Sequence, residues 1–402
     1  MSLNDTTSGE RIHIGFFGMR NAGKSSTVNA VTGQDLAVVS DIAGTTTDPV
    51  RKAMELLPLG PVLVIDTPGL DDAGAIGELR VKKARRVIDS TDIAVLVIDS
   101  ARGMTSGDEE LVDLFNKRGV PHVTVMNKCD LSGIDAGTVE LATDAAIPHA
   151  RVYTNALTGA GIHELKETLG KLVGGAQVER HILSDLIEPG DDIVLVTPID
   201  SAAPKGRLIL PQQMTVRDIL DSGAHAHVTR ETELESMLAS LARPPRLVVT
   251  DSQAFGVVSK IVPENVPLTS FSILMSRYKG DLDAQLENAA ALDDLADGDT
   301  VLLAEGCTHH RQCQDIGTVK LPTWISDYTG HDLTFEFTSG GEFPDDLSAF
   351  ALVVHCGGCM LNEREMRWRL RHAAAQGIPC TNYGMTIAKV NGILDRALAP
   401  LQ

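Results

Sequence analysis

The chain has 402 residues, of which 43% are hydrophobic, and it carries a formal net charge of −19. This length allows two or three domains with sizeable cores. The acidic balance argues against a protein that binds nucleic acid without sequence preference, because such binding depends on Lys and Arg. There is no run of about 18 apolar residues that would span a membrane, and residues 1–11 are too polar for a signal peptide. We therefore expect a cytoplasmic protein with neither a membrane nor nucleic acid as its partner.

The first strong motif follows an apolar segment near the N-terminus. Residues 18–25 match G-x-x-x-x-G-K-[ST], the phosphate-binding P-loop. The apolar run 12–17 predicts a strand before it, and the pattern over 25–32 predicts a helix after it. In this context backbone N–H groups meet phosphates at the helix N-terminus. We expect Lys24 to reach the β- and γ-phosphates and Ser25 to bind Mg²⁺.

A second motif closes the strand predicted at 62–65, which follows a predicted hairpin partner at 50–57. It reads Asp66-Thr67-Pro68-Gly69. A carboxylate at a strand end about 40 residues after a P-loop can hold the Mg²⁺ shell, which assigns that role to Asp66. The N–H of Gly69 can then be donated to a γ-phosphate.

A third motif, Asn127-Lys128-Cys129-Asp130, ends the strand predicted at 122–126 and indicates guanine recognition. The Asp130 carboxylate can accept hydrogen bonds from guanine N1–H and its exocyclic amine, a donor pair that adenine lacks. The Lys128 stem can pack over the base, and Asn127 can connect the loops. A last strand, 151–154, is followed by Asn155-Ala156-Leu157.

The middle of the chain is less informative. Residues 175–190 read as a linker, and 191–243 as a small α+β block with a strand at 192–199 and a short one at 207–210. We place His225 and His227 in a solvated turn beside Gly223. The block is small for an independent core, which favours self-association, for example by extension of a sheet across a dimer.

The last block, 244–402, has the βα pattern of a parallel sheet, with strands predicted at 247–250, 300–303 and 350–354. Ligands gather at the carboxyl ends of such strands. Two of these ends carry Cys307-Thr308-His309 and His355-Cys356-Gly357-Gly358-Cys359. If the two strands are neighbours, three thiols and two imidazoles converge. Zinc and an iron–sulfur cluster both fit such a ligand set, and ligand chemistry alone does not separate them.

The N-terminal motifs resemble those of translation-factor-type GTPases, and more closely the subgroup that contains Era and the tRNA-modification GTPase MnmE. This resemblance implies K⁺ near Asn21, Mg²⁺ coordination by Thr46 and, from a weaker match, a catalytic role for Glu78. It covers residues 11–174. The nucleotide-binding residues expected from the motifs and the resemblance together are Asn21, Ala22, Gly23, Lys24, Ser25, Ser26, Thr46, Asp66, Gly69, Asn127, Lys128, Asp130, Ala156 and Leu157.

The whole chain resembles the HydF family of FeFe-hydrogenase maturation GTPases, which joins such a G domain to C-x-H and H-C-x-x-C motifs. The resemblance implies a 4Fe-4S cluster on Cys307, Cys356 and Cys359, with His309 or His355 as a possible exchangeable fourth ligand. It also implies a scaffold and carrier for a transient diiron precursor. The expected partners are a second copy of the chain (a homodimer, possibly a tetramer), the maturases HydE and HydG, and apo FeFe-hydrogenase.

The sequence therefore predicts an α/β protein with a P-loop GTPase domain over 1–174, a small dimerisation domain over 191–243 and a cluster-binding parallel-sheet domain over 244–402. Its cofactors would be GTP, Mg²⁺, K⁺ and a 4Fe-4S cluster. Two alternatives remain open: a GTPase of the tRNA-modification type, and a regulatory GTPase stabilised by zinc. The acidic balance argues against the first, and iron content tests the second.

Overall fold

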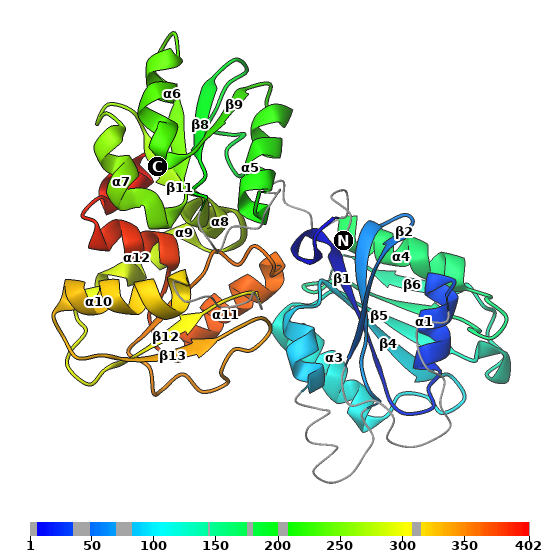
Figure 1. The fold of residues 1–402 in the computed structure, drawn as a ribbon. Helices are drawn as coiled ribbons and strands as arrows, with labels where there is room; N and C mark the ends of the chain where they lie inside the picture. The colour runs from blue at the N-terminus through cyan, green and yellow to red at the C-terminus, as the bar shows by residue number, and fades with distance from the viewer. Residues whose placement is uncertain are drawn as a thin grey trace. The chain divides into compact units, whose positions relative to one another are not determined.

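The computed structural model describes residues 6–34, 49–69, 83–143, 145–174, 180–199, 208–307 and 315–401. The chain forms two compact units, Met1–Val178 and Glu179–Gln402, which are treated separately (Figure 1). No helix among the described residues is long and apolar enough to cross a membrane.

The first unit is built on a seven-stranded sheet with the strand order β2-β3-β1-β4-β5-β7-β6. Two strands, β2 and β6, run antiparallel to their neighbours, and the other pairs are parallel. The strands are β1 (Ile12–Gly18), β2 (Val50–Leu56), β3 (Gly60–Asp66), β4 (Ile93–Asp99), β5 (His122–Asn127), β6 (Val139–Ala142) and β7 (His149–Tyr153).

Helices cover both faces of this sheet. On one face, α1 (Lys24–Thr32) and α4 (Ile162–Gly174) pack through Val28, Val31 and Leu165. On the other face, α3 (Ser106–Arg118) and a helix over residues 83–89 enclose a second apolar cluster that includes Phe17 and Phe115. The long central strands are buried on both faces, which explains their continuous apolar runs.

The strands predicted in this unit are present, with ends that differ by at most two residues. The predicted β2–β3 hairpin is an antiparallel pair. The predicted helix after the P-loop is α1, and it ends at Gly33 with a left-handed φ of 65°. A residue with positive φ closes many helices in this way, and glycine adopts it without steric cost.

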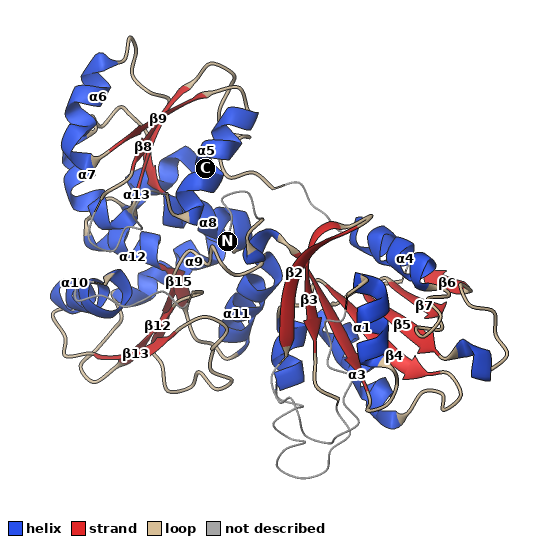
Figure 2. Ribbon diagram, turned by 45° about the vertical axis from the view of Figure 1, so that its right-hand side comes forward, coloured by secondary structure: helices blue, strands red, loops and turns tan. Residues whose placement is uncertain are grey.

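The second unit contains two four-stranded parallel sheets, with orders β11-β10-β8-β9 and β13-β12-β14-β15 (Figure 2). The first sheet is formed by β8 (Asp192–Val196), β9 (His225–Thr229), β10 (Leu247–Thr250) and β11 (Leu268–Ser270). The second is formed by β12 (Thr300–Ala304), β13 (Thr334–Thr338), β14 (Leu352–His355) and β15 (Cys380–Asn382).

The helices of the second unit lie between and around these strands. They are α5 (Leu210–Asp221), α6 (Leu234–Ser240), α7 (Phe255–Ile261), α8 (Phe271–Lys279), α9 (Leu282–Asn288), α10 (Leu321–Thr329), α11 (Glu363–Ala375), α12 (Tyr383–Val390) and α13 (Leu394–Leu398). One apolar cluster joins the two halves, with Val248 and Leu268 from the first sheet and Val354 from the second. The two sheets therefore share a core and form one structural unit.

The two halves of this unit repeat one topology. Numbered along the chain within each half, both sheets have the strand order 4-3-1-2. Their third strands also read alike: residues 247–254 are Leu-Val-Val-Thr-Asp-Ser-Gln-Ala and residues 352–359 are Leu-Val-Val-His-Cys-Gly-Gly-Cys. The pairing register superposes these segments, because Val196 is opposite Thr250 and Ala304 is opposite His355. The half with the cysteines thus has a cysteine-free counterpart in the same unit.

Several predictions for the middle of the chain are wrong. The boundary expected at 243/244 falls inside one sheet, since β10 and β11 pair with β8 and not with the strands of the last block. The block is therefore parallel α/β and larger than the α+β domain expected. Residues 208–209 form no strand, and α5 begins at Leu210. His225 and His227 lie on strand β9, where both ring systems hydrogen-bond to Asp192 Oδ1.

Candidate functional site: a guanine-nucleotide site and a cysteine site

The P-loop residues lie at the carboxyl end of β1 and the start of α1. Gly23 adopts a φ of 89°, and a Cβ built there would come within 2.1 Å of Asn127 Nδ2. Only glycine fits this position, for both conformational and steric reasons. Lys24 begins α1 and forms an ion pair with Asp66 at the end of β3. The two residues predicted to contact phosphate and the Mg²⁺ shell are thus brought together.

The other phosphate-side residues follow from the same geometry. Ser25 and Ser26 occupy the first turn of α1 and are partly buried. Gly69 lies against the P-loop, since a Cβ built on it would be 3.5 Å from the backbone of Arg20. Asn21 has a positive φ of 62° and is exposed. Thr46 and Glu78 lie outside the described residues.

Asn127 connects three loops of the site. Its Nδ2 donates to the carbonyl of Ala22 at 3.1 Å, and its Oδ1 accepts the backbone N–H of Ala156 at 3.0 Å. Asn127 is only 2% exposed, so both bonds are shielded from water. This is the connecting role expected for it.

Lys128 and Asp130 lie on the same loop. Lys128 Nζ donates to the carbonyl of Asn21 at 3.0 Å and to Asp99 Oδ2 at 2.6 Å. The second bond lowers the pKa of Asp99. Asp130 is exposed, and one of its oxygens accepts Asn155 Nδ2 at 2.8 Å. Asn155 thus orients the Asp130 carboxylate through one oxygen, and the other oxygen can accept hydrogen bonds from a nucleotide base.

Two residues of this site were not singled out from sequence. Asp99 ends β4 and Asn155 follows β7, so both carry the signal of a polar residue at the carboxyl end of a parallel strand. Leu157 is 93% exposed, and its N–H is donated to Asn155 Oδ1 at 3.0 Å. A hollow of about 120 Å³ lies beside the P-loop, and the residues that line it include Asn21, Asp99 and Lys128.

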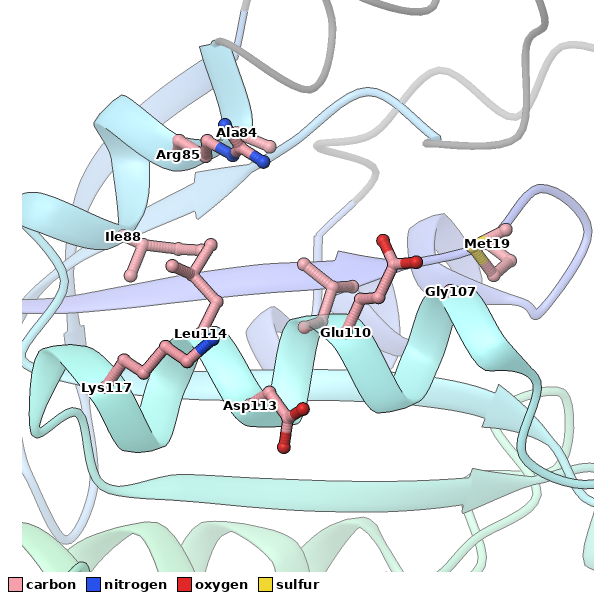
Figure 3. Close-up of a pocket in the computed structure, with 10 residues that line it drawn as sticks. Met19, Ala84, Arg85, Ile88, Gly107, Glu110, Asp113, Leu114 and Lys117 are labelled. Carbon is pink, nitrogen blue, oxygen red and sulfur yellow. The ribbon is translucent and has the colours of Figure 1, made fainter. Parts of the chain in front are cut away.

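A larger cavity of about 270 Å³ lies elsewhere in the first unit, between α3 and the helix over residues 83–89 (Figure 3). Arg85 and Ile88 face Glu110, Leu114 and Lys117 across it. Its lining contains none of the residues predicted to bind nucleotide. Met19 of the P-loop forms one end of the cavity.

The cysteine site lies at the carboxyl ends of β12 and β14, which are adjacent parallel strands. Cys307 follows β12, and Cys356 and Cys359 follow β14. The two loops touch: Gly306 N donates to Cys356 Sγ at 3.1 Å, and a Cβ built on Gly306 would be 3.4 Å from Gly358 Cα. The three cysteines are therefore on contacting loops, as expected for neighbouring strands.

The three cysteines are partly buried. Burial raises the pKa of Cys356 and raises the pKa of Cys359 to about 11. Among the described residues, no three His, Cys, Asp or Glu side chains form a group that could hold a metal ion. His309 lies outside those residues.

His355 has a different environment from the one expected of a metal ligand. It is fully buried, and its Nε2 is 3.1 Å from Arg369 Nη1 while its Nδ1 is 2.8 Å from the carbonyl of Cys356. Because a guanidinium only donates, Nε2 is the acceptor and Nδ1 carries the proton. Burial, with the charge of Arg369, lowers the pKa of His355 to about 3. Neither ring nitrogen is available, which argues against His355 as the fourth ligand.

Two further residues around the cysteines were missed from sequence. Arg369 is fully buried and donates to Glu365 Oε1 at 2.7 Å and to the carbonyl of Gly340. Tyr383 is 5% exposed and its hydroxyl has no hydrogen-bond partner among the described residues. Burial, Glu305 and the neighbouring thiols raise the pKa of Tyr383 well above its usual value. Neither residue belongs to a local motif that could have revealed it.

Comparisons with known proteins match both units of the chain. The family model of a 50S ribosome-binding GTPase matches residues 13–128. The models of the hydrogen maturase F dimerization domain and tetramerization domain match residues 182–280 and 283–400. The molecule is thus a P-loop GTPase domain joined to a duplicated α/β unit. The two maturase models together cover more than half of the chain, and the chain belongs to the HydF family of hydrogen maturases.

The MnmE proteins among the curated relatives match the first unit. The tRNA modification GTPase MnmE of Chromobacterium violaceum is 37% identical over 166 residues, which are 41% of this chain and 35% of the relative. MnmE of Paraburkholderia xenovorans is 35% identical over 184 residues, 44% of this chain and 39% of the relative. The chain thus spans little more than a third of the length of these relatives.

Solved structures show the same limited likeness. Era of Aquifex aeolicus bound to GDP and AlF₄⁻ has a TM-score of 0.35 at 17% identity, and the match covers 57% of this chain and 98% of Era. The G domain of the T. maritima FeoB iron transporter has a TM-score of 0.30 at 23% identity, over 42% of this chain and 100% of that domain.

Proposed function

We propose that this chain is a GTP-hydrolysing scaffold of the cytoplasm that binds a 4Fe-4S cluster and a diiron precursor and delivers the precursor to apo FeFe-hydrogenase. The observation that carries the proposal is the combination of two sites in one chain of the HydF family. Phosphate and guanine motifs meet in the first unit, and three cysteines lie on touching loops in the second.

The nucleotide site supports GTP binding and hydrolysis. Lys24, released from Asp66, would bind the β- and γ-phosphates, while Ser25 and Asp66 would hold Mg²⁺. Asp130 would select guanine, and Asn127 would keep its loop against the P-loop. Thr46 and Glu78 remain assigned by resemblance as the Mg²⁺-coordinating and catalytic residues, and Asn21 as the K⁺ ligand. The K⁺ would add positive charge near the transferring phosphoryl group.

The cysteine site fits an iron–sulfur cluster in its chemistry. The three side chains are thiols, the ligands that such clusters require. The glycines let this loop pack closely against its neighbours: a Cβ on Gly357 would lie 3.2 Å from Met275 Cβ, and one on Gly358 would lie 3.0 Å from Met366 Sδ. Cys307, Cys356 and Cys359 would hold the cluster, which supplies an iron for a precursor to bind. His309 remains the candidate for a displaceable fourth ligand.

The proposed partners follow from the family. The diiron unit would be received from HydE and HydG and passed to the hydrogenase, with GTP turnover governing partner release. The names of the two maturase domain models support self-association of the chain. Strand β9 is an edge of its sheet and presents the kind of open ladder that a second copy could extend.

The first experiment is anaerobic reconstitution with iron and sulfide, followed by iron analysis and EPR of the dithionite-reduced protein. We expect a 4Fe-4S signal in the wild type that disappears in Cys307→Ala, Cys356→Ala and Cys359→Ala. Cys380→Ala is the matched control, because this buried cysteine of β15 lies in the same sheet. One zinc per chain and no iron–sulfur signal would favour the zinc-stabilised GTPase instead.

The second experiment tests the nucleotide site. Lys24→Ala should abolish GTP turnover in the presence of Mg²⁺ and K⁺, whereas Lys171→Ala, an exposed position on α4, should leave it unchanged. Turnover that survives Lys24→Ala would refute the assignment. The likeness to MnmE in the first unit supports tRNA modification as a second candidate. A tRNA gel shift at physiological salt separates it, and we expect no shift.

A further inference from the structure

Lys279, the last residue of α8, contacts the loop that carries Cys359. It is 1% exposed. Its Nζ donates to the carbonyl of Cys359 at 3.1 Å and to the carbonyl of Leu361 at 2.9 Å. An ammonium group placed inside a protein is costly unless nearby groups compensate its charge. The ammonium group of Lys279 is thus buried beside the loop that carries Cys356 and Cys359.

The internal repeat provides a matched comparison. Pairing in β11 and β15 places Ser270 and Asn382 at equivalent positions, so Lys279 corresponds to Asn391. In the same way, Leu361 corresponds to Gly256. The side chain of Asn391 lies against that loop, because a Cβ built on Gly256 would be 3.0 Å from Asn391 Oδ1. Each half therefore projects a polar side chain, from the end of the helix that follows its fourth strand, onto the segment that follows the third strand of the other half.

The charge of this side chain differs between the two contacts. The loop with Cys356 and Cys359 receives the cation Lys279. The loop with Asp251 and Ala254 at the equivalent positions receives the neutral Asn391. Thiolates that hold a cluster carry net negative charge, and a nearby buried cation stabilises that charge. The positive charge thus occurs on the half that has thiolates to compensate.

We propose that Lys279 is a positioning residue that stabilises the anionic charge of the cluster on Cys356 and Cys359 and so sets its reduction potential. The inference rests on the proposed function, since it requires a cluster at this site. Adding an electron increases the negative charge of the cluster, so a buried cation favours the reduced state. Lys279 comes from the half matched by the dimerization domain model, and this half thereby controls the cluster of the other.

Three variants separate charge from hydrogen bonding. Lys279→Gln keeps a donor for the carbonyls and removes the charge, Lys279→Arg keeps the charge, and Lys260→Gln is a control at an exposed lysine of α7. Each full-length protein is reconstituted anaerobically, its iron and sulfide are counted, and the cluster is titrated with dithionite against redox mediators by EPR. Thermal melting of each protein reports on its folding.

We expect Lys279→Gln to shift the ratio of reduced to oxidised cluster at a given potential at least tenfold toward the oxidised state, which is about 59 mV. Lys279→Arg should stay within threefold of the wild type, and Lys260→Gln should equal it. Loss of the cluster in Lys279→Gln but not in Lys279→Arg would also support the role of the charge.

Two outcomes overturn the inference. One is a loaded Lys279→Gln protein with an unchanged ratio of reduced to oxidised cluster. The other is loss of the cluster in both Lys279 variants. That result would show that Lys279 holds the loop in place and that its charge has no separate role. A wild type that takes up no iron and sulfide would instead refute the proposed function itself, so the two failures are distinguishable.

Discussion

Asn127 donates its side-chain amide to the carbonyl of Ala22 across 3.1 Å and so fastens the guanine loop to the P-loop. The same side chain accepts the N–H of Ala156. Three segments far apart in the sequence thereby meet through one buried amide. The loops proposed to bind guanine and phosphate are consequently coupled through one residue.

Asn127→Ala should weaken GDP binding at least tenfold and lower the melting temperature of the nucleotide-free protein. Two buried hydrogen bonds are lost, each worth about 1 kcal/mol, and the carbonyl of Ala22 is left unpaired. Titration with a fluorescent GDP analogue measures the first effect and thermal unfolding the second. Asn116→Ala, on the exposed face of α3, is the control and should change neither.

Asp130→Asn should exchange guanine for xanthine specificity. The carboxylate accepts two N–H donors of guanine, whereas an amide at this position presents a donor that suits the C2 carbonyl of xanthine. Because the unpaired groups would be held in the site, we expect GTP affinity to fall by a hundredfold or more and XTP binding to appear. Competition binding with GTP and XTP measures both. Unaltered preference for GTP would show that another residue reads the base.

A carboxylate in the second unit makes stability depend on pH. The hydrogen bond from His227, with those from Arg243 and His225, lowers the pKa of Asp192 to about 2. A carboxyl group whose pKa is lower in the folded state contributes stability above its unfolded pKa, near 4. That contribution is lost as the pH falls from about 4 through 2.

Asp192→Asn should therefore destabilise the protein most at pH 5 to 6, and the gap to the wild type should narrow as the pH falls below 4. Urea unfolding of both proteins at pH 6, 5, 4 and 3 measures the gap. Asp327→Asn is the control, because this exposed carboxylate of α10 should give a small gap that does not change with pH. A constant gap for Asp192→Asn would contradict the prediction.

The parts of the molecule that could be predicted from sequence are those in which chemistry and local structure coincide. Gly23 and Lys24 belong to a motif of eight residues, and Asp66 closes β3, the next parallel strand along the chain. The cysteines are adjacent to buried strands, so their convergence follows once β12 and β14 pair. In each case a polar residue at the end of an apolar run is sufficient to predict that the residue lies at the carboxyl end of a strand.

The parts that could not be predicted depend on contacts between distant segments. Lys279 meets Cys359 across 80 positions, and Asn155 meets Asp130 across 25. The repeat was also hidden, because its halves share strand order and only short stretches of sequence. Assigning β10 to the last block followed from reading apolar strands in chain order, which does not show which sheet a strand joins.

His355 provides the final test, because the structure and the family resemblance assign it different roles. If His355 is a buried structural residue and not a cluster ligand, the His355→Ala protein should still assemble a cluster. The EPR g-values of that cluster should equal those of the wild type. The variant should nevertheless unfold more readily, by about 1–3 kcal/mol, since Arg369 Nη1 loses its acceptor at a fully buried position. Cys356→Ala, one residue away, should lose the cluster altogether. Altered g-values in His355→Ala, or loss of ¹⁴N coupling that the wild type shows and His309→Ala retains, would instead make His355 the fourth ligand.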